Sequence, residues 1–293
     1  MHQGPAKEPF ELTAVELRLH RWANALLADA PAGGARAKLV EFLVFGAKQA
    51  WACVFGAAML AILVVARLWY PDDAALARND ALVLAAVAIQ IVMVVAKLET
   101  GRELLVIVMF HVVDTVMEIF KTNVGSWEYP GDGVLHIGAV PLYTGFMYAA
   151  VGSYLVRVYR LFDLTFVRYP PRWATAIVAV LVYVNFFSHH YTLDIRWLLV
   201  AAVIALYART VMHFRVFRGV HRMPILVAFV GVAFFIWVAE NIGTASGAWL
   251  YPGQVDDWHV VPLSKLVAWF LLMIISVVMV AWVYKPVEPR ARR

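Results

Sequence analysis

Long apolar runs are the feature that most constrains how this chain can fold. No charged residue occurs between Leu266 and Tyr284, and none occurs between Met223 and Ala239. About 20 consecutive apolar residues are enough to cross the hydrocarbon core of a bilayer as one helix. Hydrophobic residues make up 63% of the chain and charged residues only 15%, far from the usual balance of soluble domains. The sequence therefore predicts a polytopic membrane protein.

The apolar segments predict an all-α fold with eight membrane-spanning helices. Most of the 25 Lys and Arg residues fall in alternate connecting segments, which places both termini in the cytoplasm by the positive-inside rule. The expected location is the plasma (inner) membrane, and the bilayer is the expected partner. The spans are expected at residues 40–66, 80–97, 102–121, 139–161, 172–189, 195–213, 223–243 and 261–284.

One motif occurs twice, first from Glu118 to Pro130 and again from Glu240 to Pro252. Both copies keep Glu, Thr, Gly, Trp, Tyr and Pro at the same spacing, and a Val-Pro-Leu triplet follows each copy. A recurring pattern of this length indicates an internal duplication. The repeated unit holds four spans, an even number, so the two copies are expected to have the same orientation in the membrane.

The predicted organisation has four parts. Before the first span, Leu12, Val15, Leu19, Trp22 and Leu26 recur at helical spacing, which indicates an amphipathic helix on the membrane surface or a helix that binds a partner. The parts are residues 1–39 (cytoplasmic helix and linker), 40–165 (repeat 1, spans one to four), 166–286 (repeat 2, spans five to eight) and 287–293 (basic cytoplasmic tail).

Ionisable residues lie within the predicted spans. His111, Asp114 and Glu118 share one helical face of span three, and Glu240 has the corresponding place to Glu118 in span seven. Charged groups are costly in hydrocarbon, so such residues usually face a cavity and mark function. These four residues are the catalytic candidates, because carboxylates with a His can protonate an alkene and recover the proton, as in hydration, isomerisation or cyclisation.

Further polar and aromatic residues around the two motifs are candidates for binding a substrate. The aromatic members also suit the interfacial belt of a membrane protein, and the polar members suit a network that only joins helices. The candidates are Thr122, Trp127, Tyr129, Asn185, His189, His190, Asn241, Thr244, Trp249 and Tyr251.

Several functional classes remain open at this stage. A lipid- or isoprenoid-modifying enzyme, a small-molecule or lipid transporter and a non-catalytic scaffold all fit an outward-facing polar cavity between spans three, five and seven. No cofactor and no metal is expected, since the single Cys53 lies in a span and repeated His-x-x-x-His boxes are missing. Nucleic acid is not an expected partner, because the basic residues lie in loops. The oligomeric state is left open.

The motifs resemble a known family. EIFKTNVGSWEYP, VPLYTGFMYAAVGSY, RYPPRWA, NFFSHH and FFIWVAENIGTASGAWLYP look like the YoaT-like family of bacterial integral membrane proteins, whose function is unknown, over Phe42 to Tyr284. The order of Glu118, Thr122 and Gly125, and of the aromatic turn and Val-Pro-Leu that follow them, is also similar to membrane carotenoid hydratases. The Gly-Arg-Tyr turn of those enzymes is absent. This second likeness implies acid-catalysed chemistry on an isoprenoid.

Overall fold

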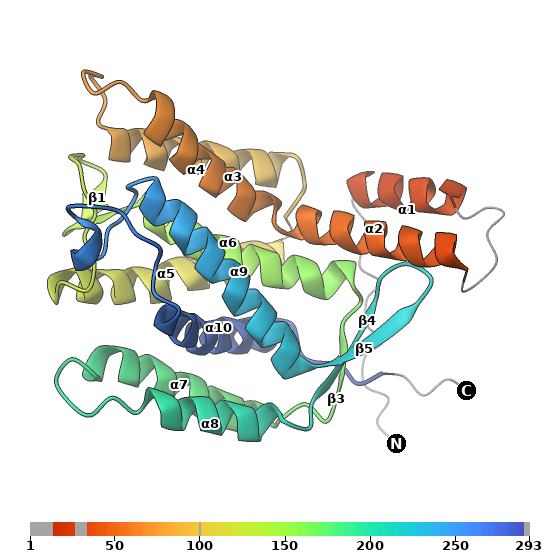
Figure 1. Cartoon of the computed structure of the whole chain (residues 1–293). Helices are drawn as coiled ribbons and strands as arrows, with labels where there is room; N and C mark the ends of the chain where they lie inside the picture. The colour runs from red at the N-terminus through yellow and green to blue at the C-terminus, as the bar shows by residue number, and fades with distance from the viewer. Residues whose placement is uncertain (1–13, 27–33, 100, 290–293) are drawn as a thin grey trace.

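The computed structural model describes residues 14–26, 34–99 and 101–289 and is mainly helical, as predicted (Figure 1). Leu12, residues 30–33 of the expected linker and 290–293 of the expected tail lie outside this described part. The α-helices are α1 (Ala14–Leu26), α2 (Ala35–Ala52), α3 (Val54–Trp69), α4 (Arg78–Val95), α5 (Gly101–Asn123), α6 (Tyr143–Leu161), α7 (Arg172–Ser188), α8 (Arg196–Tyr207), α9 (Ile225–Ala245) and α10 (Ser264–Val283). The short elements are β1 (His136–Ile137), β2 (Val140–Pro141), β3 (Thr165–Val167), β4 (Val211–Arg215), β5 (Val220–Pro224) and the 3-10 helix η1 (Pro252–Gln254).

Three described helices, α4, α9 and α10, are long and apolar enough to cross a membrane. A fourth candidate span exists if α2 and α3 are taken together, although they meet at a bend of 62°. Helices α7 and α8 are apolar but have only 17 and 12 residues. Helix α5 carries charged residues along its length, and α6 carries Arg157 and Arg160 near its end. Length and composition therefore support three or four spans among the described helices, against the eight that the sequence predicts.

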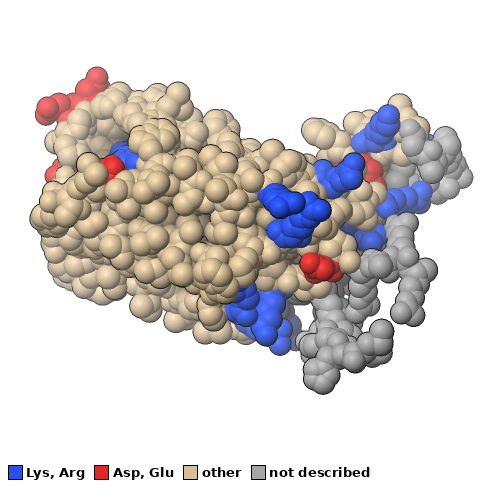
Figure 2. Space-filling model, turned by 90° about the horizontal axis from the view of Figure 1, so that it is seen from below, with Lys and Arg blue, Asp and Glu red and all other residues tan. Residues whose placement is uncertain are grey.

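The surface in Figure 2 agrees with a protein that lies in a membrane. Lys and Arg gather toward one end of this face, and its middle carries almost none of the charged side chains. A charge-free band bounded by polar ends is the surface that a hydrocarbon core requires.

The predicted span at 195–213 is divided between a helix and a strand. Helix α8 ends at Tyr207, and β4 then pairs antiparallel with both β3 and β5. Arg209 precedes this hairpin and Arg215 and Arg222 lie in its strands, and burying them in hydrocarbon would be costly. The chain therefore leaves the apolar region after Tyr207, and the apolar pattern alone did not indicate the sheet.

Glu41 of α2 holds the turn between β4 and β5. Its carboxylate accepts hydrogen bonds from the backbone N–H groups of residues 217, 218 and 219, at 3.1, 2.8 and 2.9 Å. Hydrogen bonds to a charged acceptor are among the stronger ones in proteins. The hairpin is thereby fixed beside α2 at the end of the bundle where α10 also ends (Figure 1).

Helices α5 and α6 pack closely because α6 presents two glycines to α5. A Cβ added at Gly145 would lie 2.3 Å from Nδ1 of His111, and one added at Gly152 would lie 2.9 Å from the Phe110 ring. Small residues that let two backbones approach are typical of helix packing in membranes. The glycines therefore set the distance between the helix that carries Glu118 and its neighbour.

Arg157 and Arg160, near the end of the predicted span 139–161, are buried in the structure. Arg157 is 0% exposed and lies 3.6 Å from the Glu99 carboxylate, while Arg160 lies 3.7 Å from that of Glu103. A buried cation needs a partner of opposite charge, since its desolvation is otherwise uncompensated. The two acids supply that partner and join α6 to the start of α5.

The first residues of α4 anchor the loops that carry both motifs. Arg78 donates to the backbone oxygen of Ser246 at 2.6 Å, and Asn79 donates to that of Pro130 at 3.2 Å. The Asp80 carboxylate accepts from the N–H groups of residues 134 and 135, the shorter bond being 2.8 Å. One helix terminus therefore positions both loops.

Replacing Asp80 by Ala should destabilise the protein by about 2 kcal/mol or more, because two backbone donors lose a charged acceptor. Thermal unfolding in detergent micelles measures the effect as a lower midpoint for Asp80→Ala. Asp73→Ala is the matched control, since Asp73 is exposed in the loop just before α4. Equal midpoints for the two variants would show that the loop does not depend on Asp80.

Candidate functional site

Glu118 is a buried carboxylate surrounded by hydrogen-bond donors. It lies on α5 and is 1% exposed. Its Oε2 atom accepts from Trp127 Nε1 at 2.9 Å and from the Tyr129 hydroxyl at 2.5 Å, and its Oε1 atom accepts from the Tyr148 hydroxyl at 2.5 Å. Two of these donors belong to the motif that begins with Glu118, so the motif folds back onto its own first residue.

Glu240 repeats this arrangement on α9. It is 2% exposed, and its two carboxylate oxygens accept hydrogen bonds from the Tyr251 hydroxyl and from Trp269 Nε1. Tyr251 has the same place in the second motif as Tyr129 in the first, and Trp269 follows its Val-Pro-Leu triplet at the same spacing as Tyr148. Each glutamate thus has one donor from its motif tyrosine and one from the helix that follows.

The two carboxylate sites touch through their donors. The rings of Trp127 and Tyr251 lie 6.2 Å apart, edge to face, and those of Tyr148 and Trp269 lie 6.5 Å apart. Such spacings are typical of interacting aromatic pairs. Each pair joins a donor of Glu118 to a donor of Glu240, so the two acids belong to one aromatic cluster.

A backbone bridge joins the two motifs at equivalent positions. Glu128 N donates to Leu250 O at 3.0 Å, and Leu250 N donates to Glu128 O at 2.9 Å. Glu128 precedes Tyr129 as Leu250 precedes Tyr251. The reciprocal pair holds the two loops side by side and sets the relative positions of their tyrosines.

Burial keeps the motif tyrosines protonated as donors. It raises the pKa of the Tyr129 hydroxyl well above its usual value, and the neighbouring Glu118 raises it further. Burial and Glu240 raise the pKa of Tyr251 in the same way. Because a carboxylate next to a phenol opposes loss of the phenol proton, both hydroxyls keep the proton that they donate.

Both glutamates line one elongated cavity of about 860 Å³. Its other walls are mostly apolar side chains of α2, α3, α6, α9 and α10. It runs from Glu118 and Lys265 at the motif end to Phe45 and Phe214 near the hairpin. The sequence predicts a polar cavity between spans three, five and seven; this cavity has other walls and is mostly apolar, with its carboxylates at the motif end.

Asp114 and His111 have other surroundings. Atom Oδ2 of Asp114 is buried without a hydrogen-bond partner and lies in a small space shared with Tyr148 and Tyr183. His111 packs its ring edge-on against Phe146 at 4.6 Å. No hydrogen bond joins His111, Asp114 and Glu118, although the structure describes all three. The shared helical face brings Asp114 near the Glu118 cluster through Tyr148 and leaves His111 as a packing residue.

Three of the predicted binding residues hold the backbone. The side-chain oxygen of Asn241 accepts from Val261 N at 2.9 Å and its nitrogen donates to the Trp237 carbonyl, which ties α9 to the segment before α10. Thr122 and Thr244 donate to carbonyls of their own helices, and Thr244 also accepts from an indole N–H of the following loop. The structure gives these side chains structural partners.

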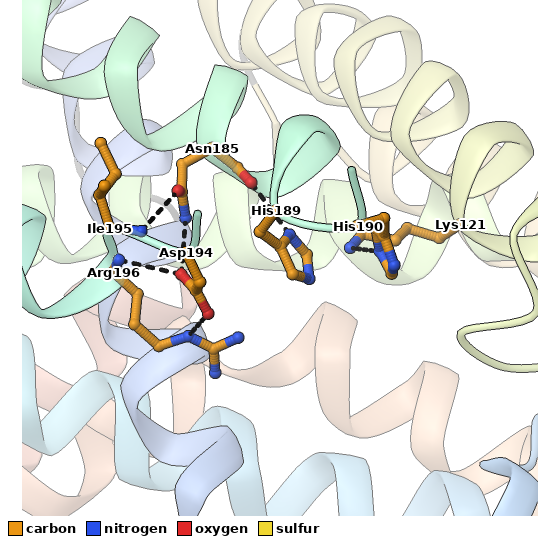
Figure 3. Close-up of polar contacts among 7 residues, drawn as sticks. All are labelled: Lys121, Asn185, His189, His190, Asp194, Ile195 and Arg196. Carbon is orange, nitrogen blue, oxygen red and sulfur yellow. Dashed lines mark hydrogen bonds and ion pairs between the residues drawn. The ribbon is translucent and has the colours of Figure 1, made fainter. Parts of the chain in front are cut away.

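The predicted residues of span five form a separate polar group (Figure 3). Asn185 accepts from Ile195 N at 3.1 Å and donates to Asp194 at 3.3 Å, so it positions the start of α8. His189 Nδ1 lies 2.9 Å from the carbonyl of Asn185. His190 is exposed and contacts Lys121 Nζ at 2.8 Å.

Trp249 has a different role from its counterpart Trp127. Its ring lies over Gly243, so close that a Cβ at this glycine would be 2.0 Å from the indole. Trp127 instead donates to a glutamate. The two motifs therefore share their sequence pattern and their tyrosine contacts, while their tryptophans differ.

Tyr148 and Trp269 are site residues that the sequence analysis missed. The signal that could have found them is that each follows its Val-Pro-Leu triplet at the same distance. The offset between these two residues differs by one from the offset between the two motifs, and the two aromatic residues are of different types, so the repeat did not reveal them.

The described residues contain no group of three His, Cys, Asp or Glu side chains placed to hold a metal ion.

Comparison with known proteins places the chain in a family. The family model described as "Protein of unknown function (DUF817)" matches residues 41–277. The chain belongs to the DUF817 family. It is 42% identical over 241 residues to the "Uncharacterized protein YoaT" of Bacillus subtilis (strain 168), a match that covers 82% of this chain and 90% of that relative. The YoaT-like resemblance is thereby confirmed. No solved structure matches this DUF817 chain.

Gly243→Ala should destabilise this DUF817 protein by about 1–3 kcal/mol, because the new methyl group forces the Trp249 ring to move in a packed site. Gly231→Ala is the matched control on the same helix, where a Cβ meets nothing within 4 Å; there Ala should be neutral or stabilising, since it favours the helix. In micelles, the midpoint of thermal unfolding should therefore fall for Gly243→Ala and stay unchanged or rise for Gly231→Ala. Similar midpoints would contradict the packing of Trp249 on α9.

Proposed function

We propose that the protein binds a long apolar molecule, a lipid or an isoprenoid, in its cavity and carries out acid–base chemistry on the end that lies between Glu118 and Glu240. The observation that carries this proposal is that both buried glutamates line the same apolar cavity. A hydratase, isomerase or cyclase is the reaction class that fits, because these reactions need only proton donors and acceptors.

The shape of the cavity favours an elongated hydrophobic ligand. Its volume lies within the range of about 300–1,000 Å³ typical of ligand pockets, and its charged groups, Glu118, Glu240 and Lys265, lie at one end. Phe235 lines the cavity and is 71% exposed, so the cavity reaches the surface of α9 within a span. A molecule dissolved in the bilayer could enter there without passing through water.

The chemistry assigns one role to each carboxyl group. In a hydration, one glutamic acid donates its proton to an alkene carbon, water adds to the resulting cation, and the other glutamate accepts a proton from that water. The two residues then exchange protonation before the next turnover. The hydroxyl groups and indoles around them fix the carboxyl groups in position, since a misplaced acid loses much of its effect.

A lipid carrier is the second candidate, supported by the same exposed side of the cavity. A carrier of small polar solutes is less well supported, because most of the residues that line the cavity are apolar. A scaffold gives no reason for two buried carboxylates at a cavity wall.

We also infer that the chain arose by duplication and that eight helical segments cross the inner membrane with both termini in the cytoplasm. The matching motifs, the equivalent donors of Glu118 and Glu240 and the bridge between Glu128 and Leu250 support the duplication. The motif loops then face the external side, opposite the hairpin with its arginines.

Glu118→Gln and Glu240→Gln should each remove activity by about 100-fold or more, the lower range for a lost general acid or base. The measurement is an untargeted comparison of lipids and isoprenoids in deletion cells that carry each variant or the unaltered chain. Glu128→Gln is the control, because Glu128 lies in the same motif but is exposed and pairs through its backbone. An identical profile in deletion and complemented cells would refute the enzyme, and solute or lipid movement in vesicles would then favour the carrier.

The inferred orientation predicts which sites a membrane-impermeant maleimide can reach. In a Cys53→Ser background, Asp132→Cys should be labelled in intact spheroplasts, and Glu288→Cys only after lysis. Both positions are exposed, one in a motif-side loop and the other after α10. The reverse pattern would overturn the assignment of the termini to the cytoplasm.

A further inference from the structure

Lys121 is a buried cation at the motif end of α5. It is 3% exposed, and its Nζ atom lies 2.8 Å from Nε2 of His190 and 4.1 Å from the centroid of the Phe186 ring. Figure 3 shows the lysine reaching the imidazole from the neighbouring helix. Since the ammonium group can only donate, Nε2 of His190 is the acceptor, and this ring carries no compensating charge.

These partners do not neutralise the charge of Lys121. Burying an ammonium group is costly unless a partner of opposite charge is present, and an aromatic face compensates only in part. Within the described part of the chain, Lys121 forms no ion pair with a carboxylate. The nearby Asp194 already forms an ion pair with Arg196, whose Nε atom lies 2.5 Å from Oδ2 of Asp194.

A second lysine lies close by. Lys265 places Nζ 3.9 Å from the centroid of the Tyr251 ring, and it is near enough to Lys121 for the two charges to repel each other. Glu240 is also near Lys265, but its two oxygens already accept from Tyr251 and Trp269. Two ammonium groups therefore lie near each other at the motif end, and among the described residues no carboxylate is paired directly with either.

The cavity reaches Lys265 and comes close to Lys121. Lys265 lines it, and so does Phe186, the ring over which Lys121 lies. A molecule that fills the apolar part would place its polar end here. His190 is exposed, so the position can be reached from the surface.

We propose that Lys121 and Lys265 bind an anionic head group, a phosphate or a carboxylate, on the lipid-like molecule that occupies the cavity. This inference rests on the proposed function, because the ligand chain is the one assigned to the cavity there. It narrows the ligand class from apolar molecules in general to anionic amphiphiles. The same two ammonium groups could take a free phosphate ion, and the experiment separates these sources.

The test titrates the purified, full-length protein in micelles and follows its tryptophan fluorescence, since Trp127 and Trp269 line the cavity. The probes are geranylgeranyl monophosphate, geranylgeraniol and inorganic phosphate. The monophosphate should bind about tenfold tighter than the alcohol, the gain expected from charge-assisted contacts. Lys121→Met and Lys265→Met should each abolish this preference and leave the affinity for the alcohol unchanged, while Lys121→Arg should retain it.

Lys285→Met is the control, because Lys285 is exposed after α10 at the other end of the molecule. Equal affinity for alcohol and monophosphate in the unaltered protein, or a preference that survives both Met variants, would overturn the head-group site while leaving the cavity proposal intact. Binding of inorganic phosphate that depends on both lysines, without binding of either isoprenoid, would support the anion site and refute the lipid occupant.

Discussion

Placing two carboxylates in an apolar interior is the constraint on which the rest of the structure depends. Each acid must receive hydrogen bonds inside the protein, because no bulk water is available to supply them. Glu118 and Glu240 obtain them from tyrosines and indoles, which bring apolar rings as well as donors. These rings fill the space around the acids, and the need to deliver them explains why each loop folds back onto the helix that precedes it.

This arrangement gathers the buried carboxylates of both motifs at one end of the molecule. Helix α4 holds both loops through its first turn, and the glycines of α6 allow α5 to approach closely. The acids are thereby held on rigid helices and not on mobile loops, which suits a site that must position a proton to within fractions of an ångström. The apolar ligand proposed for the cavity beyond them needs no such precision, because apolar surfaces are bound by contact area and not by direction.

Sequence alone could predict the helical fold and the family and could mark Glu118 and its motif as a candidate site, because apolar runs and repeated residues show them directly. That Trp127 and Tyr129 donate to Glu118 was not predicted. The sequence could not distinguish the role of Glu118 at the cavity from the structural roles of Asn241 and Asn185, because all three are polar residues in apolar segments. The distinction depends on backbone donors at Val261 and Ile195, whose approach only the folded chain sets. The break between α2 and α3 at Cys53 was missed because apolar residues continue past it. The hairpin after Tyr207 was missed because apolar residues still alternate with the arginines that follow, and the pairing of its strands is a tertiary contact.

The bridge between Glu128 and Leu250 has a consequence for the history of the fold. A reciprocal antiparallel pair at equivalent positions is unchanged by a half-turn that exchanges its two strands. A chain carrying a single motif could therefore form the same bridge with a second copy of itself. On the duplication proposed above, the centre of this molecule corresponds to the interface of an ancestral homodimer. After the two subunits were fused into one chain, the residues around each glutamate could change independently.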